Sequence, residues 1–184
     1  MCSSDLPVTR AARTAAAAST PTAIPRLVTA VIFADPASGR PVFPTPPPSC
    51  AVSATNAERP DLGPTIGEPP LWMASPALPV VPWRNDFIRS VWVVERATDG
   101  DLVLTGRRTD APGAAQFIRP GAERATEQLR IASAGRVGSP DASPTAARYA
   151  DNQVFIVLPS PGCWELTARL GANITRTVTF YVYN

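Results

Sequence analysis

The chain has 184 residues, a net charge of only +2, 22 prolines and no histidine. This length suits one domain with tails, and so many prolines disfavour long helices because proline removes a backbone donor and fixes φ. The absence of histidine excludes Ser-His-Asp and Cys-His catalysis and histidine zinc sites. The small, scattered charge argues against nucleic-acid binding. Because no phosphate loop or dinucleotide fingerprint occurs, we expect no cofactor and no metal.

Residues 1–49 are predicted to be a disordered tail and linker. Met1–Leu6 resembles a translated sequencing-adapter end, in which case these residues are an artefact. Pro7–Pro25 is rich in Ala, Thr and Pro, a composition that cannot bury enough apolar surface to order itself. A proline-rich spacer ending in Phe43–Pro48 favours an extended path. No export signal or membrane-spanning segment is present, so we expect that truncation removed the signal.

The core-building residues lie mostly after Leu71, which places the domain at 50–184. Leu71–Ala74, between prolines, is predicted to be an edge strand. Phe87–Glu95 is the first strong strand, with Trp92 on one face. Asp99-Gly100 is typical of a two-residue hairpin turn, so Asp101–Asp110 is predicted to return along the same sheet.

The middle of the domain gives weaker signals. Gln116–Ile118 and Glu127–Ala132 are further strand candidates. Ser133–Ala150 is rich in Gly, Ser and Pro and is predicted to be a long loop. Such loops can carry binding surfaces, but an unstructured excursion is the favoured interpretation here.

The last part of the chain shows the clearest alternation of apolar and polar residues. Three strands are predicted, at Gln153–Leu158, Cys163–Leu170 and Ile174–Tyr183, with turns between them. The last two each have one apolar and one polar face, which is what an antiparallel sheet with one solvated side requires. Several short strands separated by turns indicate a β-sandwich in preference to a barrel.

A family resemblance rests on Pro159–Thr167, which reads Pro-Ser-Pro-Gly-Cys-Trp-Glu-Leu-Thr. This stretch resembles the C-terminal signature, Pro-x-Pro-Gly-Cys-Trp-Glu-(Leu/Ile/Val)-Thr, of a broad set of uncharacterised bacterial exported proteins and lipoproteins. In that set an upstream cysteine follows a proline-rich stretch, as Cys50 does, and Gly67–Trp72 resembles a further element. The resemblance implies an all-β, immunoglobulin-like antiparallel sandwich outside the cytoplasm, and it transfers no active site.

With Cys2 set aside, Cys50 and Cys163 form an even count that suits an oxidising compartment. We predict a disulfide between them, placed at the rim of the sandwich because Trp164 begins the apolar face and Cys163 points to the other. Two free buried thiols are the alternative. The predicted location is therefore extracellular or in the bacterial cell envelope.

For binding, the loop residues Trp83 and Arg84 are the candidates, since an exposed tryptophan could contact a carbohydrate. The leading hypothesis is a non-catalytic extracytoplasmic module that binds an envelope protein or a carbohydrate, or that serves as a structural spacer. The alternative is a carboxylate-based hydrolase of envelope or environmental glycans. Its available acids are Glu68, Glu95, Asp101 and Glu165.

Overall fold

The computed structural model describes residues 43–84, 86–140 and 143–184. These residues belong to the second of two compact units, 42–184. The adapter-like start and the predicted disorder of residues 7–25 lie outside the described residues. Residues 43–49, the described end of the expected linker, contain no helix or strand.

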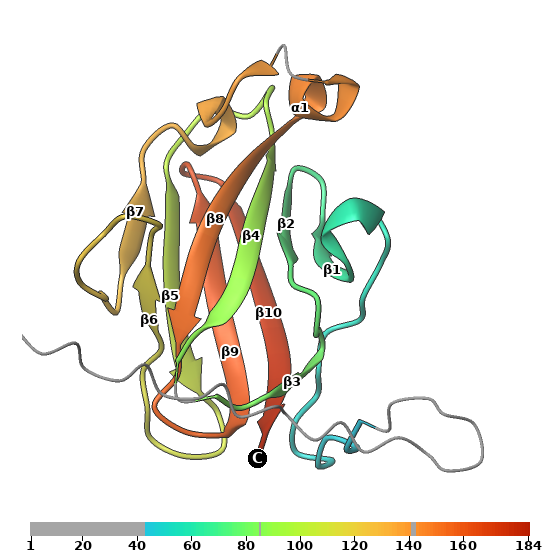
Figure 1. Ribbon diagram of the computed structural model, residues 1–184, viewed down its shortest axis with the longest axis vertical. Helices are drawn as coiled ribbons and strands as arrows, with labels where there is room; N and C mark the ends of the chain where they lie inside the picture. The colour runs from blue at the N-terminus through green and yellow to red at the C-terminus, as the bar shows by residue number, and fades with distance from the viewer. Residues whose placement is uncertain (1–42, 85, 141–142) are drawn as a thin grey trace, which may run out of the picture. The chain divides into compact units, whose positions relative to one another are not determined.

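Two five-stranded sheets make up the domain (Figure 1). The first has, in spatial order, β1 (Thr65–Glu68), β2 (Leu71–Ala74), β4 (Ile88–Glu95), β8 (Tyr149–Val157) and β6 (Gln116–Ile118). The second has β3 (Val80–Pro82), β10 (Ile174–Tyr183), β9 (Gly162–Leu170), β5 (Leu102–Arg108) and β7 (Leu129–Ile131). All pairings are antiparallel except that of β3 with β10.

The strand order is that of an immunoglobulin-like sandwich. The row β2-β4-β8-β6 occupies the positions of strands A, B, E and D, and β10-β9-β5-β7 those of G, F, C and C′. Along the chain, however, β6 in the D position precedes β7 in the C′ position, whereas C′ precedes D in an immunoglobulin domain. Between β2 and β3 the chain passes from the first sheet to the second, through a cis peptide bond at Leu78-Pro79. The predicted all-β, immunoglobulin-like fold is confirmed.

The core lies between the sheets and is built by every second residue along each strand. From β9 it receives Trp164, Leu166, Ala168 and Leu170, and from β10 it receives Val178, Phe180 and Val182. Trp92 and Phe117 of the first sheet are also fully buried. Burying such large side chains supplies the main driving force for folding.

The hairpin predicted at Asp99-Gly100 is wrong, because β4 and β5 lie in different sheets. A type I′ turn needs positive φ at both central residues. Gly100 has φ 126°, but among the described residues Ser133 is the only non-glycine with positive φ. Gly100 serves a close approach instead: a Cβ there would lie 2.7 Å from the Cα of Gly171. The segment crosses between sheets beside the β9–β10 turn.

The unstructured excursion expected at 133–150 is also wrong for its described residues. They form η2 (Ala134–Arg136), α1 (Pro144–Arg148) and the start of β8. The amide nitrogen of Asn152 donates to the Ala134 carbonyl at 3.2 Å, and the Arg96 guanidinium donates to the Val137 carbonyl at 2.9 Å. Side chains from β8 and from the end of β4 thus hold a segment whose own composition favours a loop.

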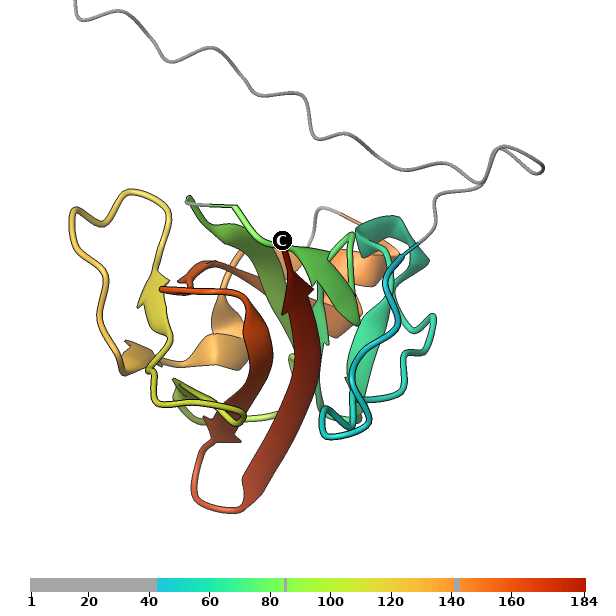
Figure 2. The same cartoon turned by 90° about the horizontal axis from the view of Figure 1, so that it is seen from below.

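Residues 50–62, which we call the strap, run across one side of the sandwich (Figures 1 and 2). The strap begins at the disulfide between Cys50 and Cys163, whose Cα atoms are 5.6 Å apart. The Ser53 amide then donates to the Thr179 carbonyl of β10 at 2.8 Å, and Asn56 forms a β-bridge with Thr65 of β1. The strap ends in η1 (Pro60–Leu62). It therefore connects the second sheet to the first.

Candidate functional site

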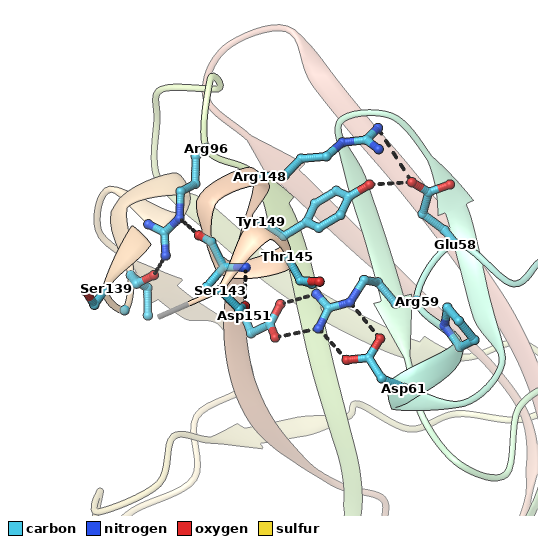
Figure 3. A pocket seen from close by; sticks show the side chains of 14 residues that line it. Glu58, Arg59, Asp61, Arg96, Ser139, Ser143, Thr145, Arg148, Tyr149 and Asp151 are labelled. Carbon is cyan, nitrogen blue, oxygen red and sulfur yellow. Dashed lines mark hydrogen bonds and ion pairs between the residues drawn. The ribbon is translucent and has the colours of Figure 1, made fainter. Parts of the chain in front are cut away.

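A hollow of about 680 Å³ with a largely polar lining lies where the strap meets α1 and the start of β8 (Figure 3). We call it the polar groove. It is lined by Glu58, Arg59, Pro60, Asp61, Arg96, Val137, Gly138, Ser139, Ser143, Thr145, Ala146, Arg148, Tyr149 and Asp151. These residues come from four separate parts of the chain, so the groove exists only in the folded domain.

Arg59 is the centre of the polar groove. Its guanidinium donates two hydrogen bonds to Asp61, at 2.9 and 2.8 Å, and two to Asp151, at 2.7 and 2.9 Å. The Arg59 side chain is only 5% exposed, whereas those of Asp61 and Asp151 are 57% and 42% exposed. One buried cation thus fixes two carboxylates that still face water, because guanidinium and carboxylate match in paired geometry.

The electrostatic effect on Asp61 follows from these bonds. The hydrogen bond from Arg59 holds the pKa of the Asp61 carboxyl below its usual range. The hydrogen bonds that Arg59 donates to Asp61 and Asp151 raise the pKa of Arg59. Both partners therefore stay charged at neutral pH.

Tyr149, at the start of β8, lies beneath the charged groups. Its ring packs edge-on against Trp72, with ring centroids 5.8 Å apart, and the guanidinium carbons of Arg59 and Arg148 lie 5.4 and 4.7 Å from its centroid. Its hydroxyl donates a hydrogen bond to Glu58. Burial, together with Glu58, raises the pKa of Tyr149 to about 12. Tyr149 is therefore a neutral donor at physiological pH.

A small apolar cluster on the outer face of the first sheet supports this arrangement. Trp72, Val93 and Tyr149 are buried together there, with Leu62 and Val91 packed against them. Trp72 and Val93 face each other across β2 and β4. The polar groove thus has a hydrophobic floor that is separate from the main core.

Arg148, the last residue of α1, borders the polar groove on its outer side. It makes ion pairs with Glu95 at 3.2 Å and with Glu58 at 3.6 Å, and its side chain is 60% exposed. Ion pairs exposed to this degree contribute about 0 to 1 kcal/mol each. Arg148 is therefore weakly held compared with Arg59.

A second hollow of about 420 Å³ adjoins the first and shares Asp61 and Asp151 with it. Its other lining residues lie on the strap, on the outer face of the first sheet and in the turn after β2: Leu62, Ala74, Pro76, Arg89, Val91 and Gln153. The exposed oxygens of Asp61 and Asp151 thus border both hollows.

The four acids proposed for a hydrolase do not gather at one site. Each is paired with a different arginine: Glu68 with Arg176, Glu95 with Arg148, Asp101 with Arg130 and Glu165 with Arg107. Of the four, only Glu95 makes an ion pair with a residue of the polar groove. The structure instead brings together a different acidic pair, Asp61 and Asp151, which no local pattern in the sequence marks as partners.

Trp83 and Arg84, the predicted binding residues, lie away from the polar groove. The Trp83 ring is half-buried, packs against the main core, and donates to the Leu158 carbonyl at 3.5 Å. Arg84 is exposed. A binding role for these two residues stays a prediction.

The disulfide predicted between Cys50 and Cys163 is present. Both cysteines are buried, yet neither belongs to the core cluster between the sheets. A Cβ at the neighbouring Gly162, whose φ is 143°, would lie 2.4 Å from the Arg108 side chain. The Pro-Gly-Cys-Trp sequence therefore needs glycine at this position.

Within the described ranges, no helix reaches the length and apolar character needed to cross a bilayer. Nor do three or more Cys, Asp and Glu side chains in this part of the chain gather in a way that could hold a metal ion.

Known proteins show little similarity to this chain. No family model matches the chain, and no curated protein matches it. Among solved structures, the chain is similar to a protein described as a "Putative Lipoprotein from Bacillus anthracis", with 14% identity and a TM-score of 0.45. That match covers 70% of this chain and 84% of the other.

Proposed function

We propose that this chain is a non-catalytic extracytoplasmic module that binds a ligand or spaces other parts of the cell envelope. The observation that carries the proposal is the disulfide that joins the strap to β9. Disulfides persist in oxidising compartments and are rare where thiols are kept reduced. The resemblance of Pro159–Thr167 to exported proteins and lipoproteins supports the same compartment.

The size of the closed loop supports a stabilising role for this bond. Cys50 and Cys163 are 113 positions apart, and closing a loop of this length stabilises a fold by about 4 to 5 kcal/mol in the chain-entropy model. That is a large part of the net stability of an ordinary domain. A protein so dependent on one disulfide is suited to an oxidising environment.

The acids of the polar groove support a binding role over catalysis. A glycosidase needs one carboxylic acid with a raised pKa to protonate the leaving group. The pKa of Asp61 is lowered, and both Asp61 and Asp151 are held by Arg59. This environment keeps Asp61 ionised, which is the opposite of what a general acid requires.

The compartment can be tested by producing the full chain, with Cys2 replaced by serine, in reducing and in oxidising compartments of one host. Alkylation under denaturing conditions followed by mass measurement counts free thiols. We expect two free thiols and a much lower urea midpoint in the reduced protein, and none in the oxidised protein. Equal midpoints for the two forms would remove the argument for an extracytoplasmic location.

A further inference from the structure

We propose that the polar groove is a binding site for a neutral oligosaccharide, contacted through Asp61, Asp151 and Arg148. This inference rests on the proposed function and deepens it, because it names the ligand class of a module whose ligand was left open.

Charge balance in the polar groove favours a neutral ligand. The described lining residues include three acids, Glu58, Asp61 and Asp151, and three arginines, Arg59, Arg96 and Arg148. A site for a phosphate or a polyanion gathers cations that lack carboxylate partners. Here Arg59 is committed to two carboxylates and Arg148 to Glu58 and Glu95. The guanidinium of Arg96 donates instead to the backbone carbonyls of Gly135, Ala146 and Val137. Such a surface offers many donors and acceptors without a net charge.

The carboxylates are pre-organised to accept hydrogen bonds. Asp61 and Asp151 are each held by two bonds from Arg59, yet 57% and 42% of their side-chain surface is exposed. Little side-chain entropy remains to be lost when a ligand binds to groups already fixed in this way. Neighbouring hydroxyls on a sugar ring can donate to carboxylate oxygens spaced on either side of one guanidinium.

The aromatic surface that a sugar ring contacts lies beneath Arg148. The guanidinium carbon of Arg148 lies 4.7 Å from the Tyr149 ring centroid, and the side chain is 60% exposed. It is held by this ring contact and by ion pairs with Glu58 and Glu95. Its displacement therefore costs little. A sugar can take the place of the Arg148 guanidinium over the ring, while the released guanidinium donates to ring hydroxyls.

The adjoining hollow indicates that the ligand is longer than one sugar. The two hollows, of about 680 and 420 Å³, share Asp61 and Asp151, so a chain of sugars can pass from one to the other over these acids. We therefore expect affinity to rise with oligosaccharide length.

The test is calorimetric titration of the full chain with the neutral hexasaccharides of N-acetylglucosamine and of glucose, with polygalacturonate as the anionic comparison. We expect at least one hexasaccharide to bind, more tightly than its disaccharide. Because the ligand is neutral, its affinity should change less than twofold between 50 and 500 mM salt, whereas affinity for a polyanion falls steeply over this range.

Matched variants locate the site. Asp61→Asn and Arg148→Ala should each weaken binding about tenfold, the loss expected for a hydrogen bond to a charged group. Asp101→Asn and Arg107→Ala change acids and arginines that are likewise in arginine–carboxylate pairs outside the polar groove, and they should leave affinity unchanged. Cooperative urea unfolding of each variant, with a folded baseline at the titration conditions, shows that the groove variants remain folded.

Three outcomes overturn the inference: no binding by either hexasaccharide, equal losses in groove and control variants, or preference for polygalacturonate with strong salt dependence. The proposed non-catalytic function is tested separately, by analysing the hexasaccharide for cleavage products after incubation with the chain. If a bound hexasaccharide is cleaved, the non-catalytic role is wrong although the site is right. If nothing binds, the thiol and stability measurements still decide the compartment.

Discussion

The two outer faces of the sandwich differ although both begin from the same alternating strand pattern. On the second sheet, Thr105, Thr167 and Thr177 lie side by side across β5, β9 and β10, and Arg107 pairs with Glu165 in the next row. On the first sheet, the outward positions carry Trp72 and Tyr149, covered by the strap and charged groups.

The difference shows how a segment outside the sheets can build a site. A solvated face needs only polar side chains that tolerate β geometry, which threonine provides. The first sheet instead has apolar residues pointing outward, and these stay buried only because another part of the chain packs over them. Arg59 lies on the strap and reaches into the polar groove. The disulfide at Cys50 anchors the strap, and it therefore also helps to hold the polar groove together.

Of the changes that test this comparison, removing the disulfide should lower the free energy of unfolding most. Replacing both Cys50 and Cys163 by serine should lower the free energy of unfolding by about 4 to 5 kcal/mol, because the unfolded chain is no longer constrained. Urea denaturation measures the loss, and Cys2→Ser is the control. A loss under 1 kcal/mol would show that the strap is held without its covalent link.

The apolar cluster gives the next largest effect. Trp72 is 1% exposed, so Trp72→Ala should cost about 3 to 5 kcal/mol. Thr167→Ala on the opposite face should change stability by less than about 0.5 kcal/mol. Similar losses of unfolding free energy for the two substitutions, measured in urea, would mean that the two faces are equivalent, contrary to this account.

Tyr149 should make the stability of the first sheet's outer face sensitive to alkaline pH. The folded pKa is raised to about 12, above the usual value of about 10. Its stabilising contribution is therefore complete below pH 10 and is lost as pH rises from 10 to about 12. Absorbance at 295 nm should show a tyrosine step near pH 12 in the native chain that is absent from Tyr149→Phe. Loss of a step at about pH 10, instead of at about pH 12, in Tyr149→Phe would place the Tyr149 hydroxyl in water.

Substitution of Asp61 should have the smallest effect on stability, and this effect should depend on pH in the acid range. Its folded pKa is lowered by Arg59, so its contribution is present above the usual value of about 3.9 and is lost as pH falls below it. Asp61→Asn should therefore reduce the acid dependence of the urea midpoint below pH 4. Tracking the midpoint of parent and variant from pH 5 to pH 2 tests this. Parallel curves would mean that Asp61 is not bound to Arg59.

The sequence could predict the features that depend on local pattern. The alternation in Cys163–Leu170 and Ile174–Tyr183 specifies strands whichever partners they take, and the hairpin follows from the short turn between them. The Asp99-Gly100 turn was misassigned because a glycine with positive φ serves a sheet crossing as well as a hairpin, and only the packing against Gly171 distinguishes the two.

The polar groove could not be predicted in the same way. Arg59 and Asp151 are 92 positions apart, and nothing local marks either of them as a partner of the other. Tyr149 occupied a segment whose Gly, Ser and Pro content favoured a loop. The one available signal was weak: Tyr149 and Asp151 alternate with Ala150 and Asn152, in phase with the strand that follows.

Hydrogen exchange of the strap in the oxidised full chain tests the central claim most directly. The Ser53 and Asn56 amides donate to Thr179 and Thr65 carbonyls, so the account predicts that they exchange far more slowly than an unstructured peptide. Exchange at the unstructured rate would contradict it, because the polar groove would then lack one of its walls.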